Sequence, residues 1–231
     1  MRGYLRFLVC LVVYLLLIAP AWSAPTCGTI LPGKKRVEWG LALNTLFKYS
    51  VNNSTTKADL RSEQLFLTLA YGIFDWLALD GKIGLADLRN DKSNHLDIDY
   101  DFRWGGGYGF RIKAYENPQN NTRLILGVHH ISVHPASEMI NSTRYKAIFD
   151  DNQIDAIFAK EYGLGIPYAG CKVSKSRLLR RDNTNDSSLH SHVRLGVILG
   201  YDYRLPRETY INIESRFIDE TAFTVGVSHI F

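Results

Sequence analysis

The stretch from Tyr100 to Lys113 reads YDFRWGGGYGFRIK and alternates large apolar residues with small or charged ones. Aromatic and aliphatic side chains fall on one parity, whereas Asp101, Arg103 and Arg111 fall on the other. A period of two is that of a β-strand with two unlike faces. A soluble sheet seldom places so many glycines and charges on its inner face. The stretch therefore predicts a strand whose apolar face is turned outward.

The same alternation continues through the chain, and no stretch after residue 24 keeps an apolar period of 3.6 residues. In the first such segment, Trp39, Leu41, Leu43, Phe47 and Tyr49 share one face. Ten strands are predicted, at residues 37–49, 65–73, 77–87, 100–113, 123–134, 153–164, 168–176, 189–202, 209–217 and 221–231.

The connections between these strands alternate in length. Long polar connections are expected at 50–61, 89–97, 135–152 and 177–188, and short ones at 74–75, 116–121, 165–167 and 203–208. Short turns at one end and long loops at the other are typical of transmembrane β-barrels. The sequence predicts an all-β fold, an antiparallel up-and-down transmembrane β-barrel of about ten strands (8 to 12), over residues 37–231.

The first residues have the pattern of an export signal. Arg2 and Arg6 precede an apolar run from Phe7 to Ala19, and Ala21 and Ser23 occupy the two positions that a signal peptidase reads. We expect a signal peptide at 1–23, Sec-type export, and a periplasmic N-terminal segment at 24–36. Loss of the two leader arginines lowers the formal charge from +4, so no electrostatic argument favours nucleic acid as a partner.

The bulk composition excludes two other classes of protein. The chain has 231 residues, of which 46% are hydrophobic and 22% charged, and its mean hydropathy is −0.11. These values are those of neither a disordered chain nor a polytopic helical membrane protein. No motif predicts a cofactor or a metal site.

The C-terminal nonapeptide from Phe223 to Phe231 alternates apolar and small residues and ends on an aromatic side chain. It resembles the terminal strand of bacterial outer-membrane β-barrel proteins. The resemblance implies an outer-membrane location in a Gram-negative bacterium and Phe231 as an assembly signal read by the barrel assembly machinery. Outer-membrane lipids and lipopolysaccharide are the further partners that it implies.

The charged faces of the strands would line the lumen of such a barrel. Eight charged residues are predicted there: Glu38, Asp80, Lys82, Arg103, Arg111, Arg194, Glu214 and Arg216. A ten-stranded barrel is little wider than one that side chains fill, and an unpaired buried arginine would be costly. We therefore expect paired charges and a filled lumen rather than a porin-like pore.

One pattern suggests catalysis. His130, Ser132 and His134 share the apolar face of their strand, just before a long connection. This short His-x-Ser pattern resembles outer-membrane lipid A deacylases, and it implies His130 as general base, Ser132 as nucleophile and Glu138 as the acidic orienting residue. The alternative is that the three are interfacial polar residues at a strand end, where polar groups are tolerated.

Cys27 and Cys171 are the two cysteines left after export, in an oxidising compartment. A disulfide between them is one prediction. The other is that Cys171 points into lipid as a small apolar residue while Cys27 stays free.

Three functions remain open on the sequence. The first is an outer-membrane barrel with a largely filled lumen and a structural or loop-mediated surface role. The second is the same barrel as a lipid-modifying hydrolase, a serine esterase acting on lipid A. The third is a soluble secreted lipocalin-like binding barrel.

The terminal strand yields a test of assembly. Deletion of Phe231 should leave unfolded protein in the periplasm, because it removes the closing aromatic. Heat-modifiable migration in a detergent gel reports the folded barrel. Unchanged migration of the deletion variant would contradict the role given to Phe231.

Overall fold

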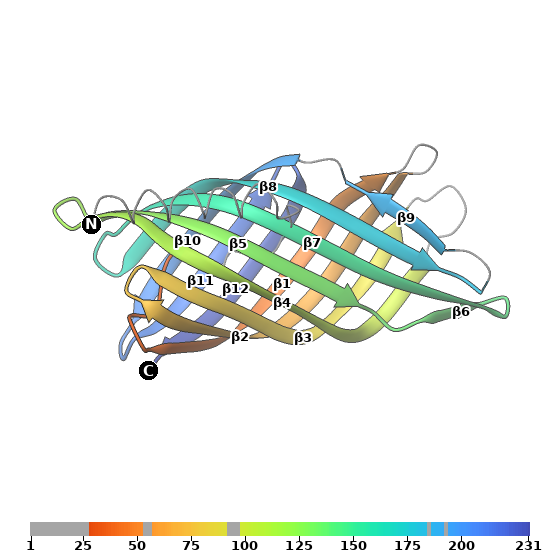
Figure 1. The fold of residues 1–231 in the computed structure, drawn as a ribbon, viewed down its shortest axis with the longest axis horizontal. Coiled ribbons are helices and arrows are strands. Elements are labelled where there is room, and N and C mark those ends of the chain that lie inside the picture. The colour runs from red at the N-terminus through yellow and green to blue at the C-terminus, as the bar shows by residue number, and fades with distance from the viewer. Residues whose placement is uncertain (1–27, 53–56, 92–97, 184–185, 192–193) are drawn as a thin grey trace, which may run out of the picture.

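The computed structural model describes residues 28–231 except 53–56, 92–97, 184–185 and 192–193, and its described elements are all strands (Figure 1). Their bounds are β1 Val37–Asn52, β2 Lys57–Phe74, β3 Leu77–Asp91, β4 Ile98–Asn117, β5 Thr122–His134, β6 Glu138–Ile140, β7 Thr143–Lys160, β8 Gly165–Arg181, β9 Asp186–His190, β10 Arg194–Leu205, β11 Thr209–Phe217 and β12 Glu220–Ile230. Among the described residues no helix is long and apolar enough to span a bilayer.

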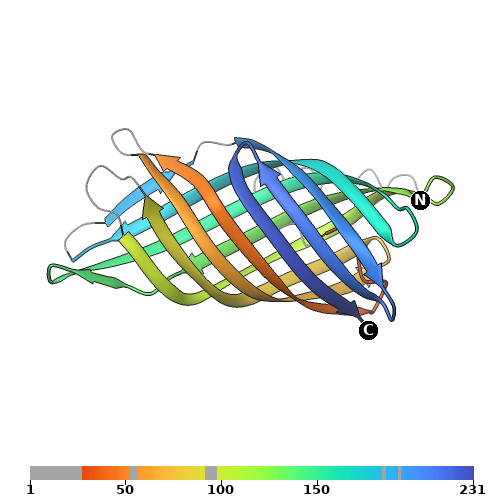
Figure 2. The same cartoon turned by 180° about the vertical axis from the view of Figure 1, so that it is seen from behind.

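The sheet closes on itself, which confirms the predicted fold class. β1 pairs with β2 on one side and with β12 on the other, and every pairing is antiparallel. Ten strands form the closed barrel, and β6 and β9 are short additional strands. We call the end that holds Val37, Gly165 and Ile230 the near rim, and the end that holds β6 and β9 the far rim; the C-terminus lies at the near rim (Figure 2).

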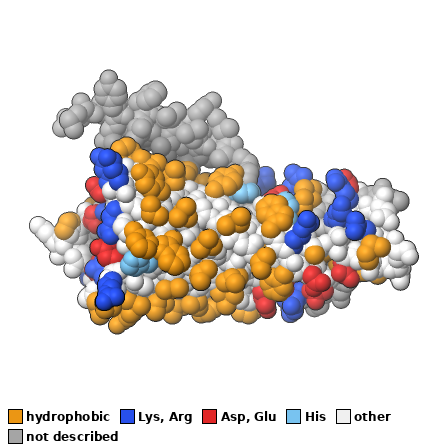
Figure 3. Space-filling view, turned by 90° about the horizontal axis from the view of Figure 1, so that it is seen from below, with side chains coloured by type: hydrophobic (Ala, Val, Ile, Leu, Met, Phe, Trp, Pro, Cys, Tyr) orange, Lys and Arg blue, Asp and Glu red, His pale blue; other side chains and the backbone are white. Residues whose placement is uncertain are grey.

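The outer wall of the barrel is apolar, as the alternation predicts. Leu41, Leu67, Ile83 and Leu199 are each about half exposed or more, and hydrophobic side chains cover much of the face seen in Figure 3. This apolar belt ends toward the far rim, where outward positions carry charges, for example Lys48 after Phe47 on β1. A soluble lipocalin-like barrel hides its apolar face inside, so that alternative is wrong.

Two β-bulges change which side chains face outward at the far ends of β1 and β4, compared with the prediction. The register of β1 shifts between Leu46 and Lys48, so Tyr49 turns inward and is fully buried rather than sharing the outer face of Trp39. A second shift, between Ala86 and Leu88 of β3, turns Tyr100 of β4 inward in the same way. An extra residue in one strand moves all later side chains to the opposite face.

The connection predicted at 135–152 is largely strand. β7 begins at Thr143, and its first residues form a hairpin with β6 through the pair Glu138↔Tyr145. The connection predicted at 177–188 is also mostly strand, because β8 continues to Arg181 and pairs there with β9. The polar composition of these segments reflects strands that project beyond the apolar belt.

β9 narrows the barrel toward the far rim. Near the middle of the wall, β8 is linked to β1 through β10, β11 and β12. The far end of β10 is Arg194, and β11 and β12 stop at the Phe217–Glu220 turn. Beyond that turn β9 bridges the same space, pairing with β8 at Leu178↔Leu189 and with β1 at Asn52↔His190. One strand replaces three, so the ring of ten becomes a ring of eight.

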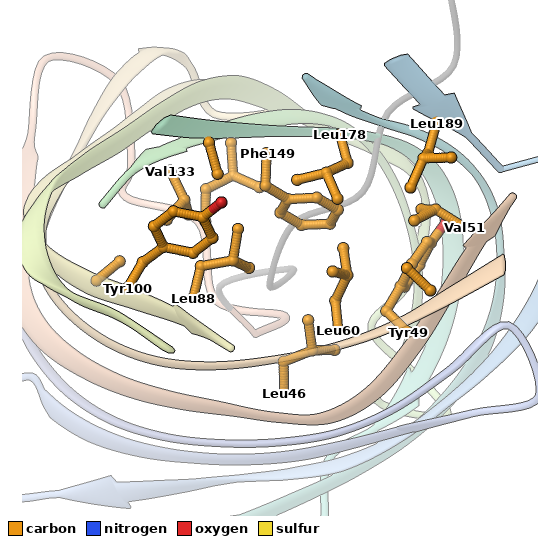
Figure 4. Packing of buried hydrophobic residues seen from close by; sticks show 14 of the residues in the cluster. Leu46, Tyr49, Val51, Leu60, Leu88, Tyr100, Val133, Phe149, Leu178 and Leu189 are labelled. Atoms are coloured by element: carbon orange, nitrogen blue, oxygen red, sulfur yellow. The ribbon is translucent and has the colours of Figure 1, made fainter. Parts of the chain in front are cut away.

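An apolar core fills this narrow part. Side chains from nearly every strand of the ring meet there, including Leu60, Leu88, Tyr100, Phe149 and Leu178 (Figure 4). Eight strands enclose a space that side chains can fill without a ligand or water. The far half of the lumen is therefore closed by hydrophobic packing.

Candidate functional site

The near half of the lumen holds the predicted charges. Of the eight residues, six are buried there: Glu38, Asp80, Lys82, Arg111, Glu214 and Arg216. Arg194 is half-buried with its guanidinium over the Tyr49 ring, and Arg103 is exposed. Arg103 departs from the prediction because the wall opens beside it near the far rim, where it lines a surface cavity.

Arg111 connects the barrel wall to the N-terminal segment. Its guanidinium donates to both carboxylate oxygens of Asp80 at 2.8–3.2 Å and to the carbonyl oxygen of Ile30 at 2.6 Å. Thr29 is fixed beside it, because its amide and hydroxyl both donate to Asp202, at 2.8 and 2.6 Å. Ile30 packs against apolar residues of the near half, so the N-terminal segment closes the near rim from inside.

Arg216 is the centre of a second network. It donates to Glu220 and Glu214 at 2.6 and 2.7 Å, to Thr224 at 2.9 Å, and to Asn44 at 2.6 Å. Such charge-assisted hydrogen bonds from both edges of the guanidinium leave little of its hydrogen-bonding capacity unused. The network joins β1, β11 and β12 across the closing seam of the barrel.

Lys172 adds a buried cation that the sequence analysis did not single out. Its ammonium contacts Asp219, in the turn between β11 and β12, at 2.9 Å and also Glu220, the first residue of β12. This connection folds into the lumen, and both carboxylates are buried. The alternation of β8 places Lys172 inward, but only the fold shows that a turn reaches it.

A polar cluster lies on the outer wall at the edge of the apolar belt. Ser132 Oγ lies 2.9 Å from His134 Nε2 and donates a hydrogen bond to Asp150 Oδ1 at 2.6 Å. Asp150 comes from β7, where it lies directly opposite Ser132 in the register. The Trp104 ring stacks on His134 with a centroid distance of 3.9 Å.

The partners of Ser132 differ from those predicted. His130 Nδ1 contacts Asn152 Oδ1 at 3.2 Å and its ring packs on Tyr108, so the imidazole beside Ser132 is that of His134. On one strand face, residues on either side of a serine are equally near, and cross-strand neighbours decide which of them turns toward it. Glu138 lies in β6, where it pairs with Tyr145, and the carboxylate at the hydroxyl is that of Asp150.

The chemistry of this cluster follows from its proton count. A serine hydroxyl carries one proton, which here is donated to Asp150, so His134 Nε2 is the donor in its contact with Ser132. In a serine hydrolase the imidazole accepts that proton and a carboxylate orients the imidazole. The three groups are thus in contact, although the carboxylate here reaches the serine rather than the histidine.

The predicted disulfide stays a prediction, because Cys27 lies outside the described residues. Cys171 is exposed on β8 between Ala169 and Val173, which face outward as well. Gly28, the first described residue, lies inside the barrel, where its carbonyl oxygen accepts from Arg111.

Phe231 lies at the near rim, where its amide donates to Val37 and its ring stacks on Trp39. Ile230 is buried beside it, so the last two side chains face opposite sides of the wall. The terminal aromatic thus joins the outer wall at the seam between β1 and β12.

A closed antiparallel barrel with an apolar outer wall and a charged interior is the fold of an outer-membrane β-barrel. Comparison with protein-family models gives no match, and comparison with curated sequences gives none either. Among solved structures, the chain is similar to the outer membrane protease OmpT from Escherichia coli, with 11% identity, a TM-score of 0.48 and coverage of 88% of this chain and 99% of that one.

Two further solved structures show the same likeness. The translocator domain of the autotransporter NalP from Neisseria meningitidis has 10% identity, a TM-score of 0.43 and coverage of 88% and 90% of the two chains. An outer membrane channel from Pseudomonas putida has 8% identity, a TM-score of 0.38 and coverage of 90% and 100%.

The Arg216 network predicts a large loss of stability on substitution. Arg216→Met leaves Glu214 and Glu220 without their shared cation, which should cost about 3–5 kcal/mol in the free energy of unfolding. Urea unfolding of the refolded protein in lipid vesicles measures it. Lys175→Met, at an exposed position on β8, is the control and should change stability by less than about 0.5 kcal/mol. Equal unfolding midpoints for the two variants would contradict the structural role of Arg216.

Proposed function

We propose that this protein is an integral outer-membrane barrel that is closed to diffusion and acts through its outer surface. The observation that carries the proposal is the filled lumen. The N-terminal segment, the networks of Arg111 and Arg216, and the apolar core around Phe149 follow one another from the near rim to the far rim. Buried side chains at all three levels support a lumen without a continuous column of water.

The orientation follows from the unequal rims. The near rim has short turns and both the start of β1 and the end of β12, whereas strands project at the far rim. In outer-membrane barrels the short turns are periplasmic and the longer connections are extracellular. In this proposal the projecting β6–β7 hairpin and the ends of β8 and β9 face the outside of the cell and carry a structural or loop-mediated surface role.

The closed lumen predicts the absence of ion conductance. The refolded protein in planar bilayers should give no stepwise increases in ionic current, because its buried ion pairs and apolar core leave no aqueous path. The matched variant opens the core: Phe149→Ala combined with Leu60→Ala removes two of its large side chains and should produce leak currents. Steady conductance by the unaltered barrel would contradict the proposal.

A second candidate function is hydrolysis of an outer-leaflet lipid ester. The contact of Ser132 with both His134 and Asp150 is the observation in its favour. These groups lie outside the barrel, where apolar positions such as Val128 give way to polar ones. That level corresponds to the boundary between acyl chains and headgroups, where the ester bonds of a lipid lie.

The reaction would use these groups in a plain acyl transfer. Ser132 Oγ bonds to the ester carbonyl carbon while its proton passes to Asp150, which already accepts a hydrogen bond from that hydroxyl. The lipid alcohol leaves with that proton, and a water molecule then releases the fatty acid and restores the serine. Lipid A is the substrate that the resemblance of the His-x-Ser pattern implies.

Ser132→Ala tests this second function. The unaltered protein should remove one acyl chain from lipid A, seen as a lower mass in the lipid A spectrum of producing cells, and the variant should abolish that loss. The control is Ser188→Ala, because Ser188 Oγ also contacts a histidine, His190 Nε2 at 2.6 Å, near the far rim. An identical lipid A spectrum with and without the unaltered protein would remove the enzyme from consideration.

A further inference from the structure

The barrel wall is interrupted between β5 and β6. Pairing of β5 with β7 ends at Val133↔Phe149, and pairing of β6 with β7 begins only at Glu138↔Tyr145. The intervening residues turn toward β4 instead, where the Ala136 amide donates to the Asp101 carbonyl oxygen at 2.9 Å. On this side, residues 146–148 of β7 therefore pair with no described strand, and Figure 1 shows β5 ending before β6.

A cavity of about 870 Å³ lies at this interruption. One lip consists of His134 to Ser137, and the other includes Lys146 and Ile148 of β7. Inward-facing and outward-facing residues of β8 both line it, such as Arg180 and Arg177. The opening thus connects the far mouth of the lumen with the outer wall.

The cavity is strongly cationic. Six basic side chains line it: Arg103, Arg144, Lys146, Arg177, Arg180 and Arg181. Among the described lining residues Asp186 is the one carboxylate, and Arg181 already holds it with hydrogen bonds of 2.7 and 2.8 Å. Those bonds lower the pKa of Asp186, so it stays ionised and paired with Arg181 rather than with the other cations.

Arg180 has unmet hydrogen-bonding capacity inside the cavity. It is half-buried, and its Nε and Nη2 atoms are inaccessible to solvent and have no hydrogen-bond partner among the described residues. These two nitrogens form one edge of the guanidinium, the edge that binds two oxygens of a phosphate or carboxylate at once. A buried donor pair left without a partner is costly, and rotation of the guanidinium toward an anion in the cavity would remove that cost.

The neighbouring cations have little counter-charge among the described residues, although Asp150 lies opposite Arg177 in the register of β7 and β8. Arg177 and Lys146 form no ion pair with any described residue. Mutual repulsion of several cations around one cavity disfavours the empty state and falls when a multiply charged anion binds. A phosphate group carries up to two negative charges and three acceptor oxygens, which suits this number of donors better than a single carboxylate.

We propose that this cavity binds the phosphate group of a phosphorylated ligand, with Arg180 making a two-point contact and Arg177 and Lys146 completing the site. The same chemistry has two sources, the phosphorylated headgroup of a glycolipid entering through the side opening, or a free phosphate entering from solution. The inference does not depend on catalysis by Ser132 or on the closed lumen.

The experiment measures binding to the purified full chain, refolded in an uncharged detergent, by titration calorimetry. The probes are lipid A with its phosphates, chemically dephosphorylated lipid A, and sodium pyrophosphate. Arg180→Gln should lower the affinity for the phosphorylated probe by at least about tenfold, because the variant loses hydrogen bonds to a charged group. Lys175→Gln, two residues from Arg177 on the same face of β8 but outside the cavity, is the matched control and should bind as the unaltered chain does.

The arms of the experiment separate the sources. Binding of intact lipid A but not of dephosphorylated lipid A or pyrophosphate assigns the site to a lipid headgroup. The site is assigned to free phosphate if pyrophosphate binds and if Arg180→Gln, but not Lys175→Gln, weakens that binding.

If Arg180→Gln does not give a heat-modifiable folded band, the double variant Arg177→Gln with Lys146→Gln takes its place. Binding of neither phosphorylated probe, or equal binding by the cavity variant and the Lys175 control, would overturn the proposal.

Discussion

Closure of the backbone hydrogen-bond ring is the constraint on which the rest of this structure depends. A barrel with an apolar outer wall has no water to satisfy a free strand edge, so each strand must find two neighbours. Where β10, β11 and β12 stop, β9 meets that demand by pairing with β8 and reaching β1 at Asn52↔His190. The number of strands in the ring therefore changes along the axis, and the interior changes with it.

The interior follows the width of the ring. In the wider near half, long charged side chains reach across the lumen, and Arg111 and Arg216 each satisfy several acceptors on different segments of the chain. In the narrower far half, aliphatic and aromatic side chains meet directly and need no polar partner. The N-terminal segment then contributes backbone carbonyl groups that complete the coordination of Arg111, so the closed near rim depends on residues that precede the first strand.

The outward side chains of the barrel change from apolar to polar at one level, and the polar cluster and the cavity both lie near that level. Below this level the outward side chains are mostly apolar; at it, Trp104 stacks on His134 beside Ser132 and Asp150. Just beyond it, the pairing between β5, β6 and β7 is interrupted, and six basic side chains line the resulting cavity. Nucleophile-like and anion-binding features are adjacent because both occur where strands leave the apolar belt and their regular pairing ends.

The alternation of side chains along the chain by itself determined the antiparallel barrel, the approximate number of its strands and which residues share a face, among them Arg111, Glu214 and Arg216. Whether the apolar face turns outward or inward was decided by the tertiary structure. A period of two is a local property, and it survives wherever a strand is regular. Only the tertiary structure decided what depends on register: the inward turn of Tyr49 and Tyr100 at bulges, the choice of His134 and Asp150 as neighbours of Ser132, and the burial of Asp219 against Lys172. Bulges and cross-strand contacts are set by residues far apart in the chain, so the pattern along one strand does not predict them.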